Sequence, residues 1–206
     1  MRSVHDSLVM LSAAGSAGYR VSPNTRTLHS VRVWGRLHPQ WAHRLAVGLS
    51  RLGISILSGF ARRDGDGSWA AEFLVAPMPG AADPMAVDYL LLTREALPAD
   101  LPPVALDDYS LDGAPERGGV LDLEVRGPDR IGFLGSLLRT LNDLALVPHE
   151  MAIVTREGEA RDRFALRSLQ GQVPSDATRR ALDAALAGQR AQNGAAARAA
   201  CPPPSA

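Results

Sequence analysis

The sequence has one cysteine, no lysine and no net charge, and each shortage excludes something. Cys201 has no second thiol with which to form an internal disulfide, so the fold does not depend on an oxidising compartment. Its 22 acidic residues balance 22 basic ones, all of them arginine. This balance supplies no basic field, and nucleic acid is therefore not an expected partner.

Long apolar runs are missing as well. No stretch approaches the roughly 18 apolar residues that a membrane-spanning helix requires. The short apolar patch 8–11 follows a segment that carries both Arg2 and Asp6, and the acidic residue argues against a secretory signal. We expect a cytoplasmic protein with no membrane partner.

The five histidines are not spaced as metal ligands. His38 and His43 lie five residues apart around an expected helix start, and the other three have no ligand-type residue at a metal-binding spacing. We expect neither a metal site nor a cofactor.

What is present in the first half is a regular order of strand, helix, strand, strand, helix. Apolar residues recur at spacings of three and four from Trp41 to Leu52, which predicts a helix that Gly53 ends. Asp83 and Pro84 predict the start of a second helix that runs to about Leu92. Alternating apolar residues predict strands at 30–34, 54–61 and 69–75, with a possible fourth at 103–111.

The second half repeats this order. Placing Gly35 on Gly127 without a gap aligns the apolar positions of two helices, which indicates an internal repeat. The aligned pairs are Trp41 with Phe133, Leu45 with Leu137, Leu49 with Leu141, and Leu52 with Leu144. Strands are expected at 119–125, 147–155 and 161–169, and a last helix at 174–188. No fourth strand is evident here, so we expect an unpaired sheet edge.

This order predicts an α+β fold of two tandem ferredoxin-like (βαββαβ) modules, each an antiparallel sheet with helices on one face. The expected segments are a mostly disordered arm at 1–27, a first module at 28–112, a linker at 113–118, a second module at 119–189 and a disordered tail at 190–206.

One turn carries a family resemblance. The hexapeptide 129–134 reads Asp-Arg-Ile-Gly-Phe-Leu and resembles the turn between the first strand and the first helix of ACT domains, where Asp-Arg-Pro-Gly-Leu-Leu is common. Ile131 replaces the proline. The tandem arrangement is similar to the paired ACT modules of bacterial uridylyltransferase/uridylyl-removing enzymes and, more loosely, to that of the tandem-ACT glycine-cleavage repressor. The corresponding turn of the first module, 36–41, has neither the acid nor the glycine.

The resemblance implies an allosteric regulator that is not itself an enzyme. It would bind an amino acid and modulate an unidentified partner protein, as a homodimer with extended sheets. The helix N-terminus would hold the ligand's carboxylate, Asp129 would accept hydrogen bonds from its amino group, and Gly132 would permit close approach. In ACT modules the second strand of a neighbouring module closes the site. The resemblance therefore implies these ligand-binding residues: Asp129, Arg130, Gly132, Phe133, Leu134, His149, Glu150 and Met151.

Other interpretations stay open. Asp129 can be the N-cap of the helix with no ligand, and Gly132 can serve packing alone. His149 and Glu150 are neighbours on a strand, so at most one of them faces inward. The whole protein can be a dimerisation scaffold without a ligand. It can also be a small acylphosphatase-type hydrolase in which Arg130 holds phosphate.

Overall fold

The computed structural model describes residues 16–95, 101, 103–114 and 119–200. Its strands form one eight-stranded antiparallel sheet in the order β1-β2-β4-β3-β7-β8-β6-β5. The expected α+β class is confirmed. Residues 1–15, residues 115–118 of the expected linker, and the terminal stretch with Cys201 lie outside the described residues.

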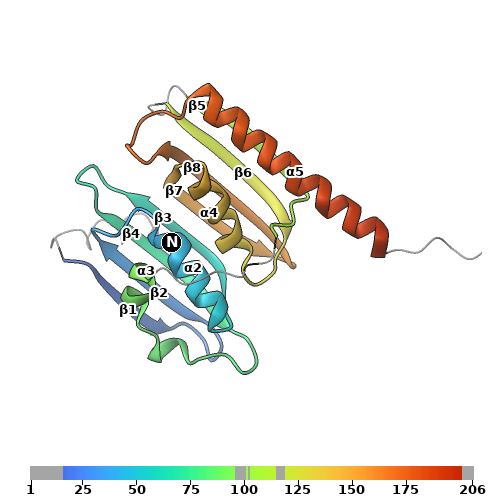
Figure 1. Cartoon of the computed structure of the whole chain (residues 1–206). Coiled ribbons are helices and arrows are strands. Elements are labelled where there is room, and N and C mark those ends of the chain that lie inside the picture. Colours follow the sequence, from blue (N-terminus) through green and yellow to red (C-terminus); the bar gives the residue numbers. More distant parts are fainter. Residues whose placement is uncertain (1–15, 96–100, 102, 115–118, 201–206) are drawn as a thin grey trace, which may run out of the picture.

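The chain divides its elements between the two ends of the sheet (Figure 1). The first half contains β1 (Gly18–Pro23), β2 (His29–Gly35), α2 (Trp41–Arg51), β3 (Ile54–Arg63), β4 (Trp69–Pro77), the 3₁₀ helix η1 (Pro84–Ala86) and α3 (Tyr89–Arg94). The second half contains β5 (Asp108–Ala114), β6 (Val120–Pro128), α4 (Phe133–Asp143), β7 (Leu146–Arg156), β8 (Glu159–Ser168) and α5 (Asp176–Ala200).

The internal repeat is visible in the geometry of α2 and α4. Both helices begin and end at residues that the ungapped alignment pairs. The Trp41 N–H donates to the His38 carbonyl at 2.9 Å, and the aligned Phe133 N–H donates to the Arg130 carbonyl at 2.9 Å. Both aromatic side chains are buried and fill the core below the helix start. The two halves therefore use the same turn to enter their first helix.

The two outer strands differ from the expectation. The arm 1–27 was expected to be mostly disordered, but its residues 18–23 form β1, which pairs with β2. The region expected to add a fourth strand to the first module instead forms β5, which pairs with β6 of the second half. Tyr109 and Leu111 of β5 pack against the core, which explains why this segment completes the second sheet. The second half therefore has no unpaired edge at β6.

The helices also differ in length from the expectation. The predicted helix 83–92 is broken into η1 and α3, and a separate aspartate caps each of them: Asp83 accepts from the Met85 N–H and Asp88 from the Leu91 N–H. At the other end α5 continues to Ala200, through most of the tail expected to be disordered. Its alanine-rich sequence favours helix, and Asn193 donates to the Asp107 carboxylate at 2.8 Å.

The four α-helices of the described residues lie on one face of the sheet (Figure 1), and the core fills the space between these two layers. On α5, Leu182 and Leu186 are buried, and Gln189 donates to Thr140 of α4 at 2.9 Å. No helix of the described residues covers the opposite face of the sheet. We call this opposite side the open face; residues such as Arg32, Phe60 and Glu124 point out from it.

The two halves meet in the middle of the sheet, where Ser58–Arg62 of β3 pairs with Glu150–Val154 of β7. Above this seam α2 and α4 touch. The His43 Nδ1–H donates to the Gly135 carbonyl at 2.9 Å. A Cβ atom added at Gly135 would lie 3.3 Å from Val47 Cγ2, so the glycine lets the two helices approach closely. The seam therefore joins both layers of the molecule.

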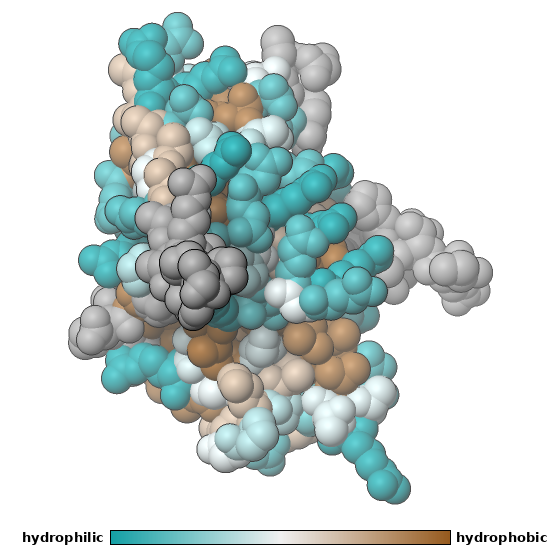
Figure 2. Space-filling model, turned by 90° about the vertical axis from the view of Figure 1, so that its right-hand side faces the viewer, coloured by the Kyte–Doolittle hydropathy of each residue, from teal (hydrophilic) through white to brown (hydrophobic). Residues whose placement is uncertain are grey.

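The surface shows no continuous apolar band on the side drawn in Figure 2. Hydrophilic side chains cover most of this side, and apolar side chains gather in its lower part, where the first half lies. Of the helices in the described residues, none is both long enough and apolar enough to cross a membrane.

Candidate functional site

The turn between β6 and α4 is held in one conformation by its backbone. Gly132 is the N-cap residue of α4 and has φ of 90°, a left-handed conformation that strains residues with a side chain. The Asp129 N–H donates to the Gly158 carbonyl at 2.7 Å, which ties the turn to the hairpin between β7 and β8. Glycine at 132 is therefore required by the turn itself, whether or not a ligand binds.

Asp129 is not the N-cap of α4, because Gly132 occupies that position and no side chain caps the helix. The interpretation of Asp129 as a simple helix cap is therefore wrong. The carboxyl is partly buried, and burial raises its pKa, although a hydrogen bond from Thr155 partly offsets this effect. A half-buried acid beside the start of a helix can accept hydrogen bonds from a cationic group.

A cleft lies between this turn and the first half of the chain. Its lining comes from the turn itself, from the start of α4, from α2 and from the start of β3. The lining residues are Ala46, Ser50, Ile54, Ser55, Ile56, Asp129, Arg130, Ile131, Gly132, Phe133, Leu134 and Gly135. Five of the expected site residues, at 129, 130, 132, 133 and 134, therefore lie together.

The other three expected site residues lie elsewhere. Met151 is 1% exposed and belongs to the core, and Glu150 points out of the open face. His149 lies in a separate hollow with Arg63 and Asp64. The reason is the antiparallel seam: the turn at 129–132 meets the start of β3, whereas residues 149–151 pair with its end. The strand that closes the cleft is β3 of the first half.

The cleft is narrow. Its volume of about 30 Å³ is roughly that of one water molecule. Ile54 and Ile56 give its far wall an apolar surface, while Ser50 and Ser55 offer hydroxyl groups. An amino acid enters only if the turn and β3 move apart.

A second acid, Asp162, lies near Asp129 in the core. It occupies a helix-facing position on β8, between Val125 of β6 and Ile153 of β7, and is 1% exposed. Its Oδ1 accepts from the Val154 N–H at 3.4 Å. Burial raises the pKa of Asp162 to about 7, the Val154 hydrogen bond opposes this, and the negative charge of Asp129 raises it further.

Asp162 was not predicted as a site residue, although the sequence contains a signal for it. In the strand 159–168 the apolar residues Ala160, Phe164 and Leu166 alternate with polar ones, and Asp162 falls on the apolar side of that pattern. A carboxyl on the buried face of a strand is costly unless something compensates it. Such a residue is a candidate for function.

The first half lacks both acids. The residues that align with Asp129 and Gly132 are Leu37 and Gln40, and the strand position that matches Asp162 is Ala71. His43 aligns with Gly135, so an imidazole ring stands where the second half has no side chain. The groups suited to bind a cationic ligand are therefore confined to the second half.

No group of three or more histidine, cysteine, aspartate or glutamate side chains in the described part of the chain is arranged to hold a metal ion. The acid pair, Asp129 and Asp162, remains as the distinctive chemistry of the site.

Comparison with protein-family models, with curated proteins and with solved structures finds no match to this chain.

Proposed function

We propose that this protein is a cytoplasmic sensor built from two ferredoxin-like, ACT-type modules, which binds an amino acid and modulates a partner protein without catalysis of its own. The observation that carries the proposal is the seam. Because β3 pairs with β7, the ACT-like turn of the second half faces β3. In the strand, helix, strand, strand, helix order of the first module, β3 is the second strand. This is the relation between neighbouring modules that the ACT resemblance implies for a ligand site.

The charge of Asp129 favours a ligand with an amino group over a phosphate. Asp129 lines the cleft at the turn before α4, and Asp162 is buried close enough to Asp129 for the two charges to interact. The Asp129 carboxylate attracts an ammonium group and repels a phosphate, whereas Arg130 of the same turn is the residue that the acylphosphatase-type alternative requires. The unpaired N–H groups of the first helical turn, at Leu134 and Gly135, suit the carboxylate of the same ligand.

Binding would change the shape of the protein because the cleft is narrow. A ligand of amino-acid size separates the turn from β3, and α2 and α4 rest on those same segments. A ligand shifts such an equilibrium only to the extent that it binds one arrangement more tightly than the other. The seam is thus the element through which binding would alter the surface offered to a partner.

A thermal-shift screen of the full chain against the twenty amino acids tests this proposal. One amino acid is expected to raise the midpoint of unfolding as its concentration exceeds its dissociation constant. The same compound without its amino group is expected to have no effect. Asp129→Asn should reduce the shift by at least about half, since a charge-assisted hydrogen bond is lost.

The repeat supplies a matched control. Leu37→Asn changes the aligned residue of the first half and should leave the shift unchanged. A shift that survives Asp129→Asn would contradict the proposed site. No shift with any amino acid would favour a ligand-free scaffold, the alternative that the small volume of the cleft supports.

A further inference from the structure

The open face carries an ordered pattern of charge. The strand register places outward-pointing residues of all eight strands in rows that cross the sheet. In the middle row, Phe60 of β3 and Ala152 of β7 lie opposite each other at the seam and are the first positions of their halves. Later positions are numbered from the seam toward each edge of the sheet. The second positions are Glu72 and Arg163, and the third positions are Arg32 and Glu124. At the second and third positions the two halves carry opposite signs, and at the outer positions Arg20 of β1 corresponds to the uncharged Ser110 of β5.

The neighbouring row continues the pattern at the seam itself. Arg62 of β3 lies directly opposite Glu150 of β7. The second positions of this row are Ala70 and Ala165, both small and both buried by their neighbours. The rows therefore combine opposite charges with small or apolar residues near the centre.

Two copies can stack these faces against each other about a twofold axis that lies between the two sheets and parallel to them. This axis can run either along the strands or across them. An axis parallel to the strands puts the first half of one copy on the second half of the other. Arg32 then faces Glu124, Glu72 faces Arg163, and Arg62 faces Glu150. An axis perpendicular to the strands would instead put each charge on its own copy, such as Arg32 on Arg32. For these three pairs the first arrangement brings opposite charges together, and the second brings like charges together.

We propose that a second copy of this chain docks on the open face, with its twofold axis parallel to β3 and β7. The interface would be sheet on sheet, with the two layers about 10 Å apart and crossed by roughly 30°. The central strands lie nearest the axis, so they stay aligned in spite of that crossing. This inference does not depend on the proposed ligand.

The size of the face suits a stable dimer. Eight strands about 4.8 Å apart span roughly 34 Å, and the rows of outward residues cover about 20 Å along the strands. Two copies would therefore bury roughly 1,300 Å², which lies within the range of specific interfaces. Two hollows of about 510 and 400 Å³ on this face leave room for the side chains of a docked copy.

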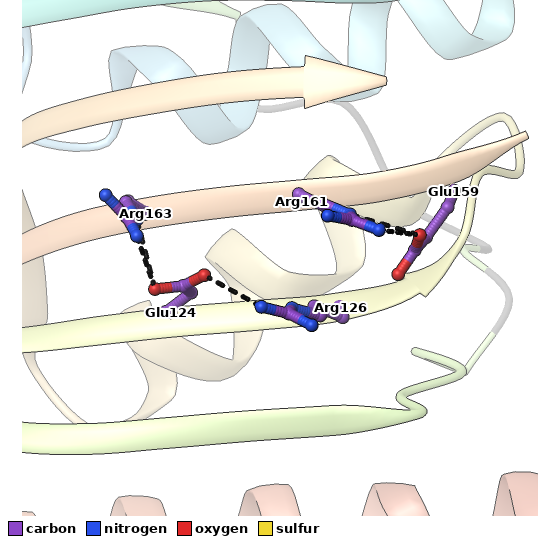
Figure 3. A network of polar contacts seen from close by, with 5 residues as sticks. All are labelled: Glu124, Arg126, Glu159, Arg161 and Arg163. Carbon is purple, nitrogen blue, oxygen red and sulfur yellow. Dashed lines mark hydrogen bonds and ion pairs between the residues drawn. The ribbon is translucent and has the colours of Figure 1, made fainter. Parts of the chain in front are cut away.

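Several of the charges on the face are already paired within one chain. The Glu124 carboxylate contacts Arg163 at 2.9 Å and Arg126 at 3.6 Å, as Figure 3 shows, and Arg32 contacts Glu72 at 3.2 Å. A docked copy would extend these pairs into longer alternating networks. For these residues it would therefore not bury an isolated charge, which is the costly case.

Sedimentation equilibrium of the full chain tests the proposal. A dimer of the 21.9 kDa chain is expected at micromolar concentration. Arg62→Glu and Glu150→Arg should each raise the dimer dissociation constant by at least about tenfold, because each reversal acts twice across the twofold axis. The double variant should restore the constant to within about threefold of the original, since it rebuilds the pair between chains.

Arg180→Glu makes the same change of charge on the exposed surface of α5 and serves as the control. It should leave the dissociation constant unchanged. Phe60→Asp should also dissociate the dimer, and its circular dichroism should match that of the original chain because the side chain points away from the core. A monomer at roughly 100 µM would overturn the proposal. So would a dimer that survives both single reversals, since its interface would then lie elsewhere.

Discussion

The two halves of this chain share one backbone plan and differ in what they bury beside their first helix. Both enter the helix through the same hydrogen-bonded turn, and both close it after the same number of residues. Three of the aligned positions that differ lie at or near the cleft of the second half. The first half has Leu37, Gln40 and Ala71 where the second has Asp129, Gly132 and Asp162.

The comparison of Ala71 with Asp162 shows whether the fold requires an acid at this buried position. Ala71 is 1% exposed and completes the core of the first half without any polar group. The same position in the second half holds a carboxyl that is equally buried, at a cost in stability. The fold does not need the acid, and its charge interacts with that of Asp129, which lines the cleft.

Transferring the acid to the first half should produce the largest effect. Ala71→Asp buries a carboxylate where the aligned turn offers no compensating group, and should lower the free energy of unfolding at pH 8 by about 4 kcal/mol. Urea unfolding followed by circular dichroism measures this. Ala76→Asp, on the open face of the same strand, should cost less than about 1 kcal/mol. Equal losses in the two variants would mean that the buried position is not special.

Removing the acid from the second half should have the opposite effect and raise the free energy of unfolding. The pKa of Asp162 is raised to about 7 in the folded protein, above its value of about 3.9 when unfolded. The folded state therefore holds the proton more tightly, and the wild-type protein loses stability as pH rises from about 4 to about 7. Asp162→Asn removes this loss. Its gain in unfolding free energy should grow by about 1.4 kcal/mol per pH unit over that window and level off above it.

Urea titrations of both proteins at pH 5, 6, 7 and 8 would check this prediction. A gain that is the same at every pH would show that Asp162 is ionised to the same extent in the folded and unfolded states. The interpretation of Asp129 and Asp162 as an interacting acid pair would then lose its support.

The smallest expected effect concerns the contact between the halves. His43→Ala removes the hydrogen bond to the Gly135 carbonyl and should cost about 1 kcal/mol at pH 8. Burial lowers the pKa of His43, so the stability it contributes is present above pH 6.5 and is lost as pH falls through its folded pKa. The penalty should therefore shrink at pH 5. His38→Ala, at the exposed turn, should change stability less; an equal loss would argue against a special contact at the seam.

Most of the fold could be read from local pattern. The helical spacing from Trp41 to Leu52, the alternating strands and the shift that aligns Gly35 with Gly127 all have counterparts in the structure. The outer strands could not be assigned in this way. An edge strand is stabilised by its partner across the sheet, and nothing within residues 108–114 says which of two sheet edges it will join.

The site was predictable only in part. The turn 129–134 was found because its residues are contiguous, but the wall opposite it was misassigned to residues 149–151. That wall depends on the direction in which β3 crosses β7, which is a tertiary property. Asp162 was overlooked because its neighbours Arg161 and Arg163 make the segment look like a solvated surface.

The seam also affects when the strands can pair during synthesis of the chain. Its partners Gly59 and Ile153 are about 90 residues apart in the chain, so β3 leaves the ribosome long before β7. At about 5–20 residues per second, this strand waits roughly 5–20 s with an unpaired edge. An exposed strand edge is open to pairing with other chains. The nascent protein is therefore most vulnerable to aggregation in that interval, and the arrival of β7 ends it.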